Sequence, residues 1–305
     1  MNKPYNAKIH LLTLKEQSIG IQDMLFKYRY NYYYYINKKL LNCSISSIVK
    51  EGTNRIDQQK QSCDSIFCPI CASTHKIRRE CAIAYGVIDK INEGIELDNG
   101  KKTSPILRYL TLTIQKEYIY LFEETFEQLK SNFKLFLKTP MQKKSGKYVT
   151  IAESLLGCSI YYHLALDDDY AGNPVVGIHL HAILLLKPSF AGVNSITQQM
   201  ICDYWMIVTG QHVLLETKIQ TLPSTPHDFK NNHAYNLAKF DFNSIIANPS
   251  KFVALIPYLQ GQHFHTHTGL IRKYRKEVRE EHKTRRKDDL VKRLNELDME
   301  TDSSM

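Results

Sequence analysis

Two histidines, His179 and His181, stand two residues apart in the apolar segment GIHLHAILLL, residues 177–186. On a β-strand, residues i and i+2 point to the same face. Both imidazoles would then face one way, while Ile178 and Leu180 pack on the other side. The apolar residues on either side of the pair predict a central strand, where a polar ring needs a partner. A metal ion is one such partner, and hydrogen bonds on a solvated face are the alternative.

A third histidine, His163, lies on the preceding predicted strand, residues 159–168. Residues 167–175 are rich in turn-forming Asp, Gly, Asn and Pro, and they predict a hairpin between the two strands. In a hairpin, the face of His163 can coincide with the face of His179 and His181. The three imidazoles are the predicted metal site, and three nitrogen ligands suit Mn²⁺ or a later transition metal better than Mg²⁺.

A further alternating set, His263, His265 and His267, has short polar flanks. These flanks predict an exposed edge strand rather than a metal site.

Clustered cysteines indicate a second kind of site. The segment CDSIFCPIC places Cys63, Cys68 and Cys71 close together, with Cys43 upstream. Thiolates at this spacing can hold a structural Zn²⁺ in tetrahedral geometry. Cys43 is the favoured fourth ligand, and His75 competes for that position. The alternative is that these cysteines are buried and behave as small hydrophobic residues.

The elements that would position these residues alternate between strands and helices. Phenylalanines and leucine at helical spacing from residue 122 predict a helix that ends before Pro140, and a Ser195–Gln198 capping box predicts another. Residues 91–105 predict a loop. Strands are expected over residues 106–115, 159–168, 176–186, 212–222 and near 262–269. Helices are expected over about 122–138, 195–209, 231–241 and 250–260. A further helix from residue 271 is expected to be peripheral and highly charged. The predicted regions are an N-terminal helical region with the zinc site over 1–90, a main α/β domain over 106–270 and a charged C-terminal helix or tail over 271–305.

The composition points to a polyanionic partner. The 305 residues carry a net charge of +9, with lysine and arginine spread along the chain. Nucleic acid is the first expectation for such a balance, and a basic protein without this role is the alternative. A signal peptide and an apolar run of membrane-spanning length are both lacking, which predicts a cytoplasmic protein without membrane contact.

Four segments in this order, CDSIFCPIC, RYLTLTIQK, GIHLHAILLL and AYNLAKF, resemble the rolling-circle plasmid replication initiators of the Gram-positive type. These initiators are members of the HUH endonuclease superfamily. The resemblance covers about residues 43–275. It implies an α+β fold in which an antiparallel sheet with an RRM-like core is flanked by helices and preceded by a small cysteine-rich zinc segment. His179 and His181 match the two metal-ligand histidines, and His163 stands where the family often has an acidic residue.

The resemblance also implies an activity. Such enzymes nick one DNA strand at an origin, with Mn²⁺ or Mg²⁺ polarising the phosphate. A tyrosine becomes linked to the 5′-phosphate, and the released 3′-OH primes synthesis. The implied partners are the plasmid origin, as single strand or hairpin, a host helicase or polymerase, and a second copy of the chain. The implied location is the bacterial cytoplasm.

The chain departs from the family at its nucleophile. In AYNLAKF, Asn236 replaces the glutamate of the family motif and Phe240 replaces its tyrosine. Tyr235 and Lys239 are four residues apart and share one helix face. Tyr235 is therefore the candidate nucleophile, and Lys239 would neutralise phosphate charge. If Tyr235 only packs, the chain is instead a nuclease-silent, zinc-stabilised DNA-binding protein for origin binding or autorepression. An RNA-binding module is a third alternative.

Overall fold

The computed structural model describes residues 77–96, 100, 102–142, 146–191, 196–211, 217–222, 229, 232, 249–259 and 261–302, and in the last helix the side chains up to residue 285. The described helices are α3 (Ile77–Asn92), α4 (Phe122–Lys138), α5 (Ile151–Ser154), α6 (Gln198–Thr209), α9 (Pro249–Leu259) and α10 (Gly269–Asp302), with 3₁₀ turns at Ile119–Leu121 and Pro188–Ala191.

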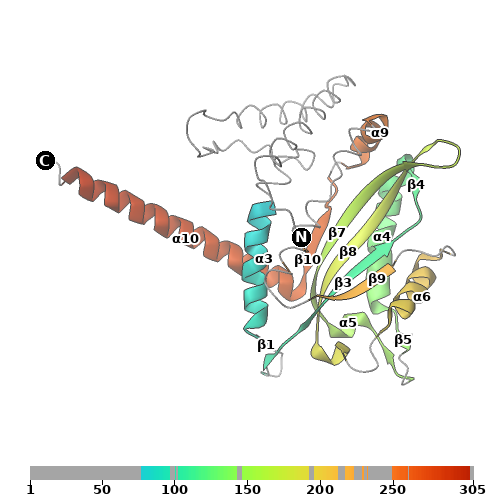
Figure 1. The fold of residues 1–305 in the computed structure, drawn as a ribbon, viewed down its shortest axis with the longest axis horizontal. Coiled ribbons are helices and arrows are strands. Elements are labelled where there is room, and N and C mark those ends of the chain that lie inside the picture. The colour runs from blue at the N-terminus through green and yellow to red at the C-terminus, as the bar shows by residue number, and fades with distance from the viewer. Residues whose placement is uncertain are drawn as a thin grey trace, which may run out of the picture.

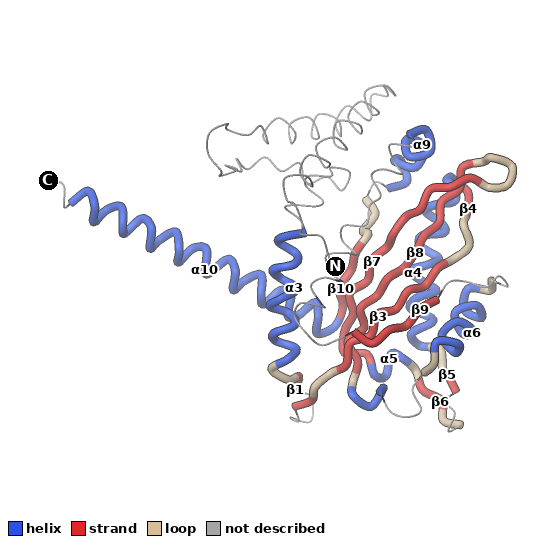
Figure 2. The backbone as a smooth tube through the Cα atoms, in the orientation of Figure 1, coloured by secondary structure: helices blue, strands red, loops and turns tan. Residues whose placement is uncertain are grey.

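A single antiparallel sheet forms the centre of the described structure (Figures 1 and 2). Its strands run in the spatial order β10, β7, β8, β3, β9, and β4 pairs with the far end of β8. Their bounds are β3 (Ile106–Thr113), β4 (Glu117–Tyr118), β7 (Leu155–Asp168), β8 (Pro174–Leu186), β9 (Thr217–Leu222) and β10 (His265–Thr268). Short hairpins are formed by β1 (Ile95–Glu96) with β2 (Lys102–Thr103) and by β5 (Met141–Gln142) with β6 (Tyr148–Val149).

The predicted α+β class is confirmed, and the main elements lie close to their expected positions. In chain order, β3, α4, β7, β8, α6 and β9 follow the sequence strand–helix–strand–strand–helix–strand. β7 and β8 are long and paired along nearly their whole length. Because β8 has a strand on each side, it is central, as its apolar flanks predicted.

One face of the sheet carries the larger hydrophobic core. Every second residue of β3, β7 and β8 faces this core and packs against α4, α6 and α9; Leu112, Ile160 and Leu180 are examples. Phe126 in α4 and Trp205 in α6 are fully buried there. Helical spacing in α4 places its phenylalanines on one side of the helix, and these side chains are buried in this core.

The opposite face is only partly apolar. At one end, Leu107, Ile183 and Leu185 form a second core with α3 and the start of α10, in which Val87 and Val278 are also buried. Figure 1 shows α3 and α10 crossing beside this end of the sheet, with the rest of α10 extending away from it. The other end of this face carries the polar side chains described below.

Three local predictions are corrected. Residues 91–105 contain the β1–β2 hairpin rather than a plain loop. α6 begins at Gln198, so its N-cap is Thr197, whose Oγ1 accepts a hydrogen bond from the Met200 N–H at 3.2 Å, and Ser195 lies two positions too early. The helix predicted from residue 271 is not wholly peripheral, since Val278 and neighbouring side chains of its first turns are buried.

In the part of the chain that the structure describes, none of the helices combines the length and the apolar character needed to cross a bilayer.

Candidate functional site

The three predicted histidines lie together on the sheet face opposite α4 and α6. His163 on β7 is directly across from His179 on β8, and His181 is across from Tyr161. On the other side of β8, Thr113 and Thr111 of β3 lie opposite His179 and His181. Because the hairpin register places His163 beside His179, the shared face that the sequence predicted is present.

The imidazoles differ in their separation and exposure. The ring centroids of His163 and His181 are 4.2 Å apart, and those of His179 and His181 are 6.4 Å apart. His163 and His181 are 8% and 5% exposed, whereas His179 is half-buried. His179 is therefore the ring of the three that solvent reaches most easily.

Hydroxyl groups on β3 orient His181. The Tyr109 hydroxyl lies 2.7 Å from His181 Nδ1, and the Thr111 hydroxyl lies 3.2 Å from the same atom. A hydrogen-bond partner on one ring nitrogen fixes the orientation of an imidazole, and metal-binding histidines commonly have such a partner. With Nδ1 turned toward Tyr109, Nε2 is the atom of His181 that a metal would use.

The donor chemistry suits a transition metal, but the side chains are not arranged as a finished site. Among the described residues, no three His, Cys, Asp or Glu side chains converge closely enough to hold a metal ion. Binding by His163, His179 and His181 together would require at least one ring to rotate. Rotation about the side-chain torsions is a small rearrangement compared with moving a strand.

Two histidines of the second set, His265 and His267, belong to the same face. β10 is an edge strand, as predicted, and it pairs with β7 so that His265 lies across from Tyr161 and His267 across from Ser159. His267 Nδ1 lies 2.9 Å from the Ser159 hydroxyl. We call the sheet face that carries the five histidines of β7, β8 and β10 the histidine face: His163, His179, His181, His265 and His267.

Sequence reasoning missed several polar residues of this face. Tyr109 and Thr111 alternate with buried leucines in the segment ILRYLTLT, and Ser159 and Tyr161 alternate in the same way on β7. This alternation was visible in the sequence. The register between strands far apart in the chain was not, and it decides which of the alternating residues meet the histidines.

Two tyrosines on β7 are unsuited to act as nucleophiles. Burial raises the pKa of Tyr161 well above the usual value, and burial does the same for Tyr162 on the opposite face. A phenol that resists ionisation is a poor nucleophile. Burial therefore makes these two tyrosines poor candidates for the attacking phenol of the reaction that the resemblance implies.

The remaining predicted site residues lie outside the described part of the chain. They are the zinc candidates Cys43, Cys63, Cys68, Cys71 and His75, and the catalytic candidates Tyr235 and Lys239. Their roles stay predictions.

Comparison of this chain with known proteins identified no relative. No family model, no curated protein and no solved structure matches this chain.

Proposed function

We propose that this chain is a rolling-circle replication initiator of the HUH endonuclease type, acting on plasmid DNA in the bacterial cytoplasm. The observation that carries the proposal is the arrangement of His163, His179 and His181. Two imidazoles separated by one residue project from the central strand on the face opposite α4 and α6, and the third lies beside them on β7.

The order of the strands also supports the proposal. β7, β8, β3 and β9 are neighbours in that spatial order, and α4 and α6 pack in one hydrophobic core on one side of them. A β-α-β-β-α-β chain with this arrangement is the split β-α-β topology that an RRM-like core would have. Such a core leaves one face of its central strands available for nucleic acid.

The proposed reaction transfers a phosphodiester to a tyrosine. The Tyr235 phenol loses its proton to solvent, and its oxygen forms a bond to the scissile phosphorus. The bond from phosphorus to the 3′-oxygen breaks, and that oxygen takes up a proton to become the 3′-OH primer. Lys239 would offset the phosphate charge. A divalent ion, Mn²⁺ or Mg²⁺, held by the imidazoles would polarise the phosphate.

The Tyr109 hydroxyl would act through His181. By holding Nδ1, it would leave Nε2 as the atom of His181 that binds the metal ion. We propose that a structural Zn²⁺ in the cysteine segment stabilises the fold and takes no part in the reaction. Contacts with a host helicase or polymerase, and with a second copy of this chain, are also part of the proposal.

A covalent adduct tests the proposal. The full chain is incubated with Mn²⁺ and a random-sequence library of single-stranded DNA labelled at its 3′ end, so that the recognised sequence is represented. We expect a labelled species that migrates with the protein on a denaturing gel and disappears after protease treatment. Absence of this species with Mn²⁺ and with Mg²⁺ would overturn nicking and favour the binding-only alternative.

Three variants assign the roles. His179→Ala/His181→Ala should abolish the adduct, whereas His263→Ala, at an exposed histidine just before β10, should retain it. An adduct that persists without His179 and His181 would show that the site is misplaced. An adduct that survives Tyr235→Phe would remove Tyr235 as the nucleophile and leave the metal-site assignment standing.

A further inference from the structure

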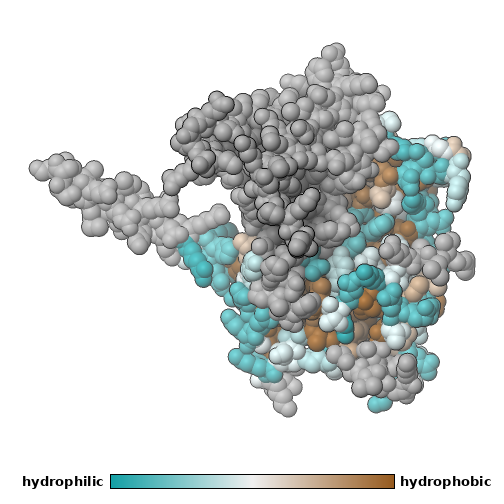
Figure 3. Space-filling model, viewed as in Figure 1, coloured by the Kyte–Doolittle hydropathy of each residue, from teal (hydrophilic) through white to brown (hydrophobic). Residues whose placement is uncertain are grey.

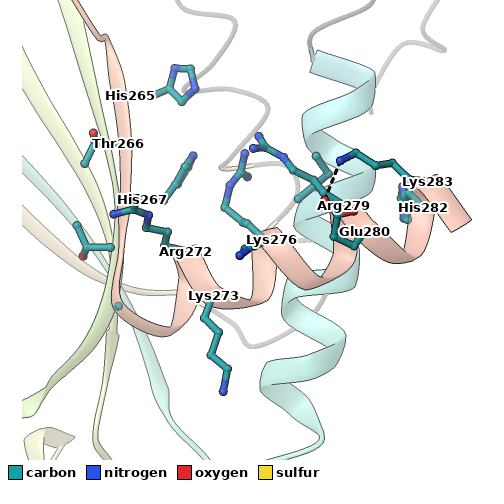
Figure 4. Close-up of a pocket in the computed structure, with 14 residues that line it drawn as sticks. His265, Thr266, His267, Arg272, Lys273, Lys276, Arg279, Glu280, His282 and Lys283 are labelled. Atoms are coloured by element: carbon teal, nitrogen blue, oxygen red, sulfur yellow. Dashed lines mark hydrogen bonds and ion pairs between the residues drawn. The ribbon is translucent and has the colours of Figure 1, made fainter.

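A strongly basic groove runs between β10 and the first turns of α10 (Figure 4). Six of the side chains that line it are lysine or arginine, and one is glutamate. His265 and His267 of the histidine face form its wall on the sheet side. We call this hollow the basic groove. The described surface around the start of α10 is mostly hydrophilic in Figure 3.

The cations of α10 form a row. Arg272, Lys276, Arg279 and Lys283 are spaced by four, three and four residues, which places them on one side of the helix. At 1.5 Å per residue this row is roughly 16 Å long. A single row of this length matches the backbone of one nucleic-acid strand, whereas a duplex presents two backbones separated by a groove about 12 Å wide.

Two acidic residues of α10 are directed away from the groove, whereas Glu280 lines it and pairs with Lys283 at 2.7 Å. Glu277 and Glu281 pair with Lys90 of α3, at 3.7 and 2.8 Å. Within the described residues, no carboxylate lies within ion-pair distance of Arg272 or Lys276. Both of these side chains are exposed. Their charge is therefore available to an anion in the groove.

Not every cation of the groove is available. Glu80 of α3 binds Arg275, which is almost completely buried, and contacts Arg279 at 3.1 Å. These ion pairs attach α10 to α3 and set the direction in which the helix leaves the sheet. Arg272 and Lys276, which are exposed, are the cations of the groove that the proposal uses.

We propose that the basic groove holds the phosphate backbone of single-stranded DNA and directs that strand onto the histidine face. The choice of DNA rests on the proposed function, but the groove's affinity for a single strand does not require cleavage. β10, β7 and β8 are neighbouring strands, so the groove wall is about 10 Å from the central histidines. A strand bound along α10 would reach those histidines within a few nucleotides.

Binding without cleavage tests the groove separately. Fluorescence anisotropy of a labelled single-stranded oligothymidylate is measured with the full chain and no added divalent metal, over a range of salt concentrations. In Arg272→Gln/Lys276→Gln, the dissociation constant should rise about tenfold or more near 0.1 M salt, and the slope of log affinity against log salt should fall by about 1.4, because each lost contact on a single strand contributes about 0.7.

Matched variants exclude general effects. Lys134→Gln/Lys138→Gln removes two exposed charges from α4, on the other side of the sheet, and should change the affinity less than twofold. Arg272→Lys/Lys276→Arg keeps the charge and should keep the affinity. An unchanged affinity in Arg272→Gln/Lys276→Gln, or tighter binding of duplex DNA or of a matched RNA, would overturn the groove proposal. Groove-dependent binding without a covalent adduct would instead overturn only the proposed nicking.

Discussion

The Tyr161 side chain lies on the histidine face, and its burial there changes the pKa of its hydroxyl. Its ring is buried between His267, at a centroid distance of 6.3 Å, and His181, which lies across from it in the sheet. Burial raises the pKa of its hydroxyl well above that of an exposed phenol, while a hydrogen bond to Ser159 partly opposes the shift. The folded protein therefore keeps this phenol neutral under conditions in which the unfolded chain would ionise it.

This shift predicts a loss of stability at alkaline pH. Because the folded pKa is raised, the contribution is fully present below the unfolded pKa of about 10 and is lost as the pH rises further, at about 1.4 kcal/mol per pH unit at most. The free energy of unfolding, measured by urea titration from pH 8 to 11, should fall less steeply in Tyr161→Phe than in the parent chain. The variant Tyr120→Phe, at an exposed tyrosine, is the control. Parallel curves for Tyr161→Phe and the parent would contradict the assignment.

At the site, the sequence predicted the positions of some residues and not of others. The strict alternation around His179 and His181 was enough to place both rings on one face, and the turn residues before Val175 were enough to add His163. The hydroxyls of Tyr109 and Thr111 could not be assigned to His181, because they belong to a strand about seventy positions earlier. Pairing between distant strands is decided by the packing of the whole sheet.

Among the elements, α10 differs most from its sequence pattern. Its many lysines, arginines and glutamates predict a solvated helix. In the structure its first turns are anchored by Val278 and by Arg275, whose partner Glu80 is 195 positions earlier. A buried ion pair of this separation leaves no local signal, because each residue alone has the appearance of an ordinary surface charge. Long elements such as α4 and β8 were predictable because their periodicity is local.

Breaking this ion pair should loosen α10. Glu80→Gln removes a carboxylate that is 8% exposed and leaves Arg275, 5% exposed, without a charge partner, so the free energy of unfolding should fall by about 3 kcal/mol. Glu281→Gln breaks a pair between the same two helices, but its side chain is 47% exposed, and the loss should stay below about 1 kcal/mol. Urea titration of both variants gives the comparison. Equal losses would show that burial of the Glu80 pair is not what holds the helices together.

At the scale of the whole molecule, one sheet separates two layers of unlike character. Among the described elements, α4, α6 and α9 pack on one face in an extensive hydrophobic core, and α3 and α10 pack on one end of the other face in a smaller core. The histidine face and the basic groove both lie on the side with the smaller core. The polar side chains of the strands lie on this second side, while the same strands are stabilised by the larger core behind them.

Because both cores share β3, β7 and β8, the two layers should open together. Hydrogen exchange measured by mass spectrometry should give similar opening free energies for peptides from 83–91 and 271–278 and for peptides from 106–113 and 178–186. In Glu80→Gln, the opening free energies of both pairs of peptides should fall by a similar amount, because one cooperative unit loses stability as a whole. Faster exchange of α3 and α10 already in the parent chain would show that the smaller core is a separate unit.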